Sequence, residues 1–125
     1  TSPPYFDREQ YSNDEEQSYK AYPQYDDWRD NFLKPTLTNA FESLRNDRYL
    51  LWNIADIKIG TDKYHPLEQD SIDIVESLGG QYKGKLKMLM TRMIGLDPSS
   101  SGIKNSVKIN GEYFKYEPIF IFYKK

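Results

Sequence analysis

The 125-residue sequence contains no cysteine and one histidine, His65. Without cysteine there are no disulfide bonds, thiolate-bound metals or cysteine nucleophiles. A single histidine leaves little from which to build a multi-histidine metal site or a Ser-His-Asp triad. No apolar run approaches the ~20 residues of a membrane-spanning helix, and no signal-peptide pattern is present. We therefore expect a soluble, cytoplasmic protein.

The composition is that of a folded domain. Hydrophobic residues make up 38% of the chain and aromatic residues 15%, which is enough for a core. The length fits one domain or a piece of one. Because the chain begins with Thr1 and not with methionine, we expect a processed chain or a fragment.

The net charge of −2 hides an asymmetry between the two ends. Residues 1–30 carry eight acidic and three basic side chains, whereas residues 83–125 carry nine basic and three acidic ones. A locally basic end suits phosphate groups. An ordinary solvated charged face explains the same residues and is the simpler interpretation.

Apolar periodicity predicts two helices. The first begins at Asp26 or Asp27 and ends near Arg45, with a kink or break at 33–34 because Pro35 removes a hydrogen bond. Its apolar face comprises Trp28, Phe32, Leu33, Leu37, Ala40, Phe41 and Leu44. The second helix begins at Pro66 and stops at Gly79-Gly80, with a stripe formed by Leu67, Ile74, Val75 and Leu78. His65 precedes it and is best explained as a loop or cap residue.

Three further segments read as strands. The run 49–55 is apolar between charges, which predicts a strand buried on both faces, followed by Asp56 and a loop to Tyr64. Residues 82–91 alternate, which predicts a strand with one solvated side and with Met88, Met90 and Met93 as core fillers. After a loop over 95–112, the run 114–123 predicts a final strand that is central where it is apolar, at Ile119–Phe122, with Pro118 near its start or on a bulge.

The first residues carry the most unusual chemistry. In Ser2-Pro3-Pro4-Tyr5, two prolines stiffen the backbone and expose carbonyl groups. The Ser2 hydroxyl and these carbonyls would hold an amino group beside the aromatic face of Tyr5. Residues 7–25 follow as a polar, tyrosine-rich segment, which predicts a loop that either orders on a partner or is packed down by its own tyrosines.

With this pattern in hand, the chain resembles the amino-group DNA methyltransferases that modify N4 of cytosine or N6 of adenine. The family signature is Asp/Asn/Ser-Pro-Pro-Tyr, and the similarity extends over nearly the whole chain. The matching segments are Ser2-Pro3-Pro4-Tyr5, the helix around Trp28 and Phe32-Leu33-Lys34-Pro35, the strand Tyr49–Ile54 with Asp56, and Phe114–Phe120.

The resemblance implies a catalytic role for Ser2, Pro3, Pro4 and Tyr5 in a DNA methyltransferase that uses S-adenosylmethionine (SAM). The target base is flipped out of the duplex. The Ser2 side chain and the Pro3 carbonyl accept hydrogen bonds from its exocyclic amine, which positions the amine for methyl transfer. Tyr5 and Phe6 bind the substrate base by stacking. Serine in the first position leans toward cytosine N4, although adenine enzymes also carry it.

The chain also departs from the family. No Gly-rich segment of the kind that holds SAM is present, since Gly79-Gly80 follows a helix. The strand that would deliver the motif and an evident target-recognition domain are absent too. The resemblance therefore implies the C-terminal half of an enzyme of DNA methylation, as in restriction-modification, from a prokaryotic or phage-infected cell. Residues 1–25 would be the catalytic motif and active-site loop, and residues 26–125 the α/β portion.

This half would form part of a Rossmann-like class I SAM-dependent methyltransferase sheet, in the order helix-strand-helix-strand-strand with the last two strands antiparallel. The strand 49–55 would be an exposed edge that pairs with the missing N-terminal half or with a second copy of the chain. SAM would bind only with the missing half, so the isolated chain is expected to be inactive.

Two other interpretations stay open. In the first, the chain is a non-catalytic DNA- or protein-binding module derived from a methyltransferase half. In the second, it is an unrelated α/β domain in which Ser2-Pro3-Pro4-Tyr5 is a disordered tail.

Overall fold

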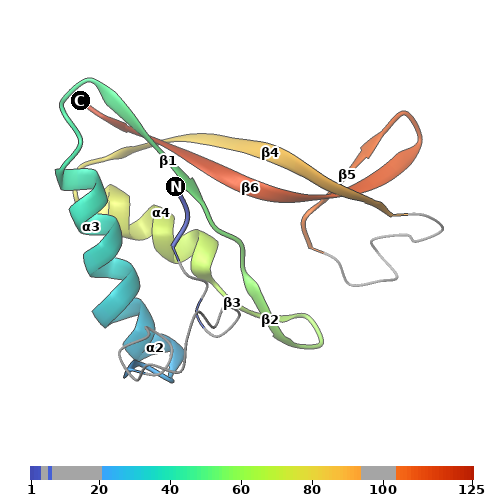
Figure 1. Ribbon diagram of the computed structural model, residues 1–125, viewed down its shortest axis with the longest axis horizontal. Helices are drawn as coiled ribbons and strands as arrows, with labels where there is room; N and C mark the ends of the chain where they lie inside the picture. The colour runs from blue at the N-terminus through green and yellow to red at the C-terminus, as the bar shows by residue number, and fades with distance from the viewer. Residues whose placement is uncertain (4–5, 7–20, 94–103) are drawn as a thin grey trace.

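The chain folds into a small mixed α/β domain with a mostly antiparallel, open sheet (Figure 1). The computed structural model describes residues 1–3, 6, 21–93 and 104–125. Its elements are α2 (Tyr25–Trp28), η1 (Arg29–Leu33), α3 (Lys34–Glu42), β1 (Arg48–Asn53), β2 (Ile57–Gly60), β3 (Lys63–His65), α4 (Leu67–Ser77), β4 (Gln81–Met93), β5 (Ser106–Ile109) and β6 (Glu112–Lys124).

The main sheet is built around the last strand. Its order is β1-β6-β4, and β5 pairs with the far end of β6. Each of these ladders is antiparallel, so β1 and β4 run in the same direction on either side of β6. The predicted antiparallel pairing of the last two strands and the central position of Ile119–Phe122 are confirmed. None of the ladders that join these strands is parallel, so they do not show the predicted Rossmann-like sheet.

The first predicted helix forms as one irregular helical segment. α2, η1 and α3 follow each other without a gap, and η1 is a π-helical turn. The amide of Lys34 donates to the carbonyl of Arg29, five residues earlier, so the wide turn comes directly before Pro35. The helix is thus distorted where we predicted a kink and is not broken. Its predicted apolar face is buried or packed against the core.

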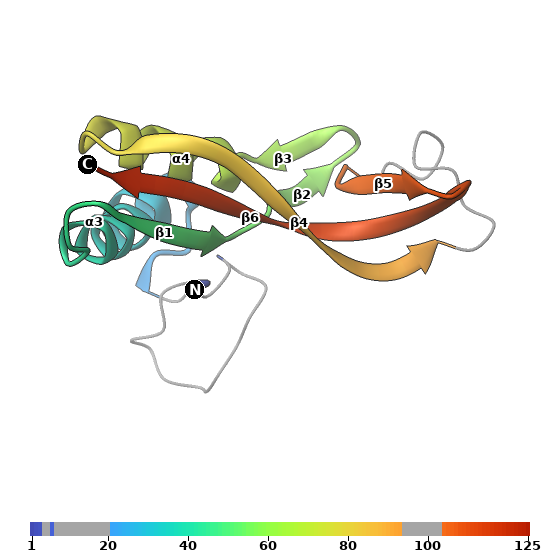
Figure 2. The same ribbon diagram turned by 90° about the horizontal axis from the view of Figure 1, so that it is seen from above.

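The second helix, α4, matches its predicted bounds closely. Leu67, Ile74 and Val75 are buried, and Leu78 packs against the core. The helix ends before Gly79, whose φ of 88° suits glycine. Figures 1 and 2 show α3 and α4 on the same side of the main sheet.

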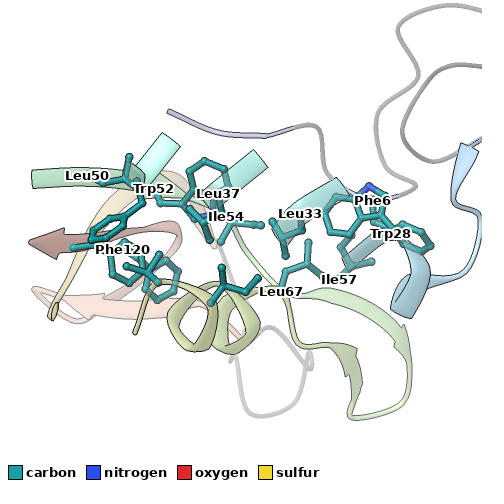
Figure 3. Close-up of a cluster of buried hydrophobic side chains, with 14 of the residues drawn as sticks. Phe6, Trp28, Leu33, Leu37, Leu50, Trp52, Ile54, Ile57, Leu67 and Phe120 are labelled. Carbon is teal, nitrogen blue, oxygen red and sulfur yellow. The ribbon is translucent and has the colours of Figure 1, made fainter. Parts of the chain in front are cut away.

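The core lies between these helices and one face of the sheet (Figure 3). Trp28, Leu33, Leu37, Trp52 and Phe122 are at most 1% exposed. The pairs Trp52↔Phe120 and Leu50↔Phe122 place large side chains from β1 and β6 on this face. Trp52 Nε1 donates to Ser71 Oγ of α4 at 3.2 Å, which gives the buried indole N–H a hydrogen-bond acceptor.

The strand around 49–55 is not buried on both faces, which corrects our prediction. Leu50 and Trp52 are buried, whereas Tyr49 is 59% and Leu51 44% exposed. A period of two shows that β1 presents one face to the core and the other to the surface. The sequence suggested burial on both faces because the residues of this strand that point outward are apolar as well.

Two predicted loops contain strands. The segment after Asp56 forms the β2–β3 hairpin, and part of the loop 95–112 forms β5. Asn110 and Gly111 both have positive φ, 50° and 81°, and join β5 to β6 as a two-residue hairpin. An Asn-Gly pair between strands is the strongest local hairpin signal, so the sequence did contain the information for β5.

Met88 and Met90 are not core fillers. They are 39% and 52% exposed, because β4 and β6 are each 13 residues long and run past the helices that cover the sheet. Figures 1 and 2 show this extension, with β5 beside it, as an arm that projects from the helical part.

Pro118 lies in the middle of β6, not near its start or on a bulge. It pairs with Lys87 of β4 and is fully buried. β1 pairs with residues 119–124 and β5 with residues 112–115, so at 117 and 118 β4 is the strand beside β6 among the described residues. A proline is tolerated here because this stretch lacks one of its two neighbouring strands.

Replacing Gly80 by alanine tests the packing of α4 on the first helical segment. A Cβ atom there would lie 2.4 Å from Val75 Cγ1 and 2.9 Å from Phe41 Cζ. We expect Gly80→Ala to lower the free energy of unfolding by about 1–3 kcal/mol through overpacking, measured by urea denaturation. Gly60→Ala is the control, since its nearest atoms are 3.8 Å away. Equal stability of the two variants would contradict this packing.

Candidate functional site

The first residue of the chain pairs with the edge of the sheet. The amino group of Thr1 donates to the Leu51 carbonyl at 2.9 Å, and the Thr1 carbonyl accepts from the Asn53 amide at 2.8 Å. In a parallel pair of strands, one residue forms hydrogen bonds to the residues before and after its partner, as Thr1 does around Trp52. Thr1 therefore occupies the position of the next strand, parallel to β1.

The residues of the predicted motif follow at the carboxyl end of β1. Ser2 is exposed and Pro3 is buried. Pro4 and Tyr5 lie outside the described residues, as does the predicted loop except for its last residues. The structure therefore brings the Ser2 hydroxyl and Pro3 to the loop-facing end of the sheet.

Phe6 lies in an aromatic cluster. It is 4% exposed, and its ring centroid lies 5.5 to 5.7 Å from those of Tyr25, Trp28 and His65. Tyr25 and His65 stack with centroids 4.5 Å apart and planes inclined by 9°. His65 thus packs at the end of β3, and Tyr25 shows that at least this tyrosine packs its segment down. The stacking of Tyr5 and Phe6 on a base stays a prediction.

Tyr25 is tied to α4 by a charged hydrogen bond. Its hydroxyl donates to Asp70 Oδ2 at 2.6 Å. Burial raises the pKa of Tyr25 well above its ordinary value, and the hydrogen bond to Asp70 and the charge of that carboxylate raise it further. The side chain therefore keeps its proton and anchors α2 to α4.

Asp56 and Glu68 are joined by two reciprocal hydrogen bonds. The Glu68 amide donates to Asp56 Oδ1 at 2.8 Å, and the Asp56 amide donates to Glu68 Oε2 at 3.0 Å. These bonds fix the first turn of α4 against the end of β1, in the manner of a helix cap. The sequence placed Asp56 at this end but did not indicate its partner.

Lys104 and Asn105 close the cluster from the other end of the chain. Lys104 forms an ion pair with Asp56, and its Nζ lies 3.7 Å from Glu68 Oε2. Asn105 Nδ2 donates to Glu68 Oε2 at 3.2 Å. Burial alone would lower the pKa of Lys104, but the hydrogen bond to Asp56 and the charges of both carboxylates raise it above its ordinary value. Lys104 is therefore cationic.

A cavity of about 320 Å³ opens beside this cluster. Its walls come from the end of β1, the β2–β3 hairpin, the start of β5 and the middle of β6. The lining residues are Ala55, Asp56, Lys58, Tyr64, Lys104, Asn105, Lys115 and Tyr116. This basic cavity, as we call it, contains three lysines and two tyrosines, a set that suits an anionic, partly aromatic ligand.

A second cavity, of about 250 Å³, lies between η1, with the first residue of α3, and α4. Arg29 and Asp30 form an ion pair of 2.9 Å at its rim, and Asp70 and Asp73 line it. Among the residues that the structure describes, no group of three histidine or acidic side chains is arranged to hold a metal ion. In the same part of the chain, no helix is long and apolar enough to cross a membrane.

Comparison with known proteins leaves the family open. No family model matches the chain, no curated protein matches it, and no solved structure resembles it significantly. The resemblance to amino-group methyltransferases therefore rests on the residues quoted above.

Replacing Asp56 tests the cluster at the start of α4. Asp56→Ala removes the acceptor of the Glu68 amide and the partner of Lys104, so we expect a loss of about 2 kcal/mol in the free energy of unfolding. Asp56→Asn keeps one acceptor and should cost less. The exposed Glu76 serves as control, with Glu76→Ala expected within ~0.5 kcal/mol of wild type. A loss no larger than that of the control would count against the cluster.

The Tyr25–Asp70 bond makes a pH-dependent contribution to stability. Because the pKa of Tyr25 is raised in the folded state, its contribution is complete below the ordinary pKa of ~10 and is lost as the pH rises above it. We expect Tyr25→Phe to lower the free energy of unfolding by about 1.5 kcal/mol at pH 7 and by less above pH 10. Urea denaturation across this range measures the difference.

The control is Tyr82→Phe, because within the described residues Tyr82 makes ring contacts with Phe120 and Phe122 but no hydrogen bond through its hydroxyl. Its difference from wild type at pH 7 should be smaller than that of Tyr25→Phe. A Tyr25→Phe difference that does not decrease above pH 10 would rule out the proposed linkage.

Proposed function

We propose that this chain is the C-terminal half of a SAM-dependent DNA methyltransferase that transfers a methyl group to the exocyclic amine of a flipped cytosine (N4) or adenine (N6). In this proposal the half has a partial Rossmann-like class I sheet, acts in the cytoplasm of a prokaryotic or phage-infected cell, and is inactive without its N-terminal partner half.

The observation that carries the proposal is the pairing of Thr1 with β1. A parallel strand in this position would end where Ser2-Pro3-Pro4-Tyr5 begins, at the carboxyl end of β1. In open α/β sheets, ligands bind at the carboxyl ends of the strands. The methyltransferase interpretation requires that the strand next to β1 delivers this motif. Thr1 lies in the position of that strand.

The surface of the sheet also supports a larger fold. The face opposite α3 and α4 carries exposed apolar side chains from β1 and β4. They are Tyr49, Leu51, Leu86, Met88 and Met90, between 39% and 59% exposed. Sheets of α/β enzymes carry helices on both faces. An apolar second face, together with the open edge of β1, therefore favours a further layer and further strands contributed by the N-terminal half or by a second copy of the chain.

In the proposed reaction this chain positions the target amine. The Ser2 hydroxyl and the Pro3 carbonyl accept hydrogen bonds from the amine, which leaves its lone pair directed away from both. Tyr5 stacks on the base. Most of the rate enhancement would come from this positioning. The exposure of Ser2 and its place at the end of the sheet are compatible with such a contact.

Neither of the two cavities described above has a lining that suits SAM. The cavity between η1 and α4 is lined mainly by charged side chains, and the basic cavity contains three lysines. Neither presents an apolar slot or the Gly-rich turn that a nucleoside cofactor requires. SAM would therefore be bound by the N-terminal half.

The test is reconstitution. The polypeptide encoded upstream of Thr1 is expressed separately, mixed with this chain, and supplied with duplex DNA and SAM carrying a labelled methyl group. We expect methyl transfer only in the mixture, and SAM binding by isothermal titration only when the upstream half is present. Ser2→Ala in this chain should lower the rate at least tenfold because it removes one acceptor, whereas the exposed Ser77→Ala control should not change it.

Three outcomes would contradict the proposal. Methyl transfer by this chain alone would show that it is not a half enzyme. DNA binding without methyl transfer in the mixture would favour the non-catalytic module. A stable monomer with no affinity for the upstream half, measured by light scattering, would remove the proposed partner.

A further inference from the structure

The basic cavity brings together cations from distant parts of the chain. Lys58 comes from β2, Lys104 precedes β5 and Lys115 lies on β6, and all three line the same space of about 320 Å³. The asymmetry in the sequence placed several of these lysines at the basic end, but Lys58 lies outside that stretch. The fold therefore brings lysines together that are far apart in the sequence.

The acidic side chains beside the cavity are already engaged. Asp56 Oδ1 accepts from the Glu68 amide, and Asp56 forms an ion pair with Lys104. Glu68 Oε2 accepts from the Asp56 amide and from Asn105. These carboxylates form a back wall that fixes Lys104 and Asn105 in place. An anion entering the cavity would thus meet donors whose positions are set in advance.

Aromatic rings hold further lysines at the rim. Lys104 Nζ lies 5.4 Å from the ring centroid of Tyr64, and Lys85 and Lys87 lie 5.7 and 5.1 Å from that of Tyr116. Such contacts restrain long side chains that would otherwise be free in solvent. They extend the positive charge from the cavity along β4.

Lysines outnumber carboxylates in the part of this region that the structure describes. The cavity and its rim carry lysines 58, 85, 87, 104 and 115 beside the carboxylates of Asp56 and Glu68, in a chain of net charge −2. A basic patch on an acidic protein attracts an anionic partner to this part of its surface.

Not every lysine of the basic end belongs to this patch. Lys124 Nζ donates to the carbonyls of Phe41, Glu42 and Leu44, so it caps the end of α3. Its charge is used within the fold. Lys34 and Lys125 are exposed and do not line the basic cavity, which makes them matched controls.

The cavity and the predicted motif both lie beyond the carboxyl end of β1. It begins at Ala55 and Asp56, directly after β1, and Ser2 and Pro3 follow the residue that pairs with Trp52 of the same strand. A nucleic acid that delivers a base to the motif would therefore bring its backbone close to these lysines.

We propose that the basic cavity and its rim bind the phosphodiester backbone of duplex DNA, with Lys58 and Lys115 each contacting a phosphate. This inference rests on the proposed function for its choice of ligand. Phosphate contacts position the duplex without reading its sequence, so binding at this site should not depend on sequence.

The experiment measures binding of a fluorescent 30-base-pair duplex of arbitrary sequence to the 125-residue chain by anisotropy, between 50 and 200 mM salt. Each phosphate contact contributes about 0.9 to the slope of log affinity against log salt. We expect the double variant Lys58→Gln/Lys115→Gln to lower that slope by about two, which makes its affinity about twelvefold less sensitive to salt over this range. Lys115→Arg should keep the wild-type slope. Lys104 is left unchanged because it pairs with Asp56 and Glu68.

The double variant Lys34→Gln/Lys125→Gln removes the same charge elsewhere and should keep the wild-type slope. Circular dichroism confirms that both variants are folded. Equal slopes for the two double variants, or no binding of the duplex by wild type, would overturn the inference. Pyrophosphate is the second ligand: its binding without that of the duplex would identify a site for a free anion and would equally overturn it.

The outcome is separable from that of the proposed function. Methyl transfer by the reconstituted enzyme with unchanged DNA affinity in Lys58→Gln/Lys115→Gln would refute the site and keep the function. A slope that falls as expected without methyl transfer would keep the site and refute the function.

Discussion

The structure depends on β6, because every ladder of the main sheet passes through it. β1 and β4 do not pair with each other, and β5 pairs with β6 as well. On the face toward the helices, β6 supplies Phe120 and Phe122, which are 2% and 0% exposed. At its end, the Lys124 ammonium caps the carbonyls that α3 leaves unpaired. One strand thus fixes both the order of the sheet and the position of the first helical segment.

Sequence reasoning worked where one local pattern decides the structure. Seven apolar positions on one face predicted the first helical segment, and the Pro66 and Gly79 signals bounded α4. It failed where the pattern was ambiguous or ignored. Apolar residues on both faces of β1 concealed its exposed side. The polar and glycine-containing segments around β2, β3 and β5 concealed hairpins, even though Asn110-Gly111 marked one of them.

The candidate site divides in the same way. The position of Asp56 after a strand pointed to a ligand-binding end of the sheet, and a cavity lies there. Its partners were out of reach, because Glu68 and Lys104 are 12 and 48 residues away and the contacts depend on how α4 and β5 are placed. Likewise, no local signal predicted that Thr1 pairs with Trp52. That contact connects the motif at the start of the chain with the sheet. In the proposed enzyme it marks the edge at which the N-terminal half would join this chain.

We propose that β1 is an open edge and that the N-terminal half contributes the strand that completes it. Asn53 donates to Thr1, and by the alternation of an edge strand the amides of Tyr49 and Leu51 also point away from β6. Amide hydrogen exchange, measured by NMR for this chain alone and mixed with the upstream half, tests this directly. We expect the amides of Tyr49 and Leu51 to exchange rapidly in this chain alone and to become protected in the mixture. Unchanged rapid exchange of both amides in the mixture would contradict it.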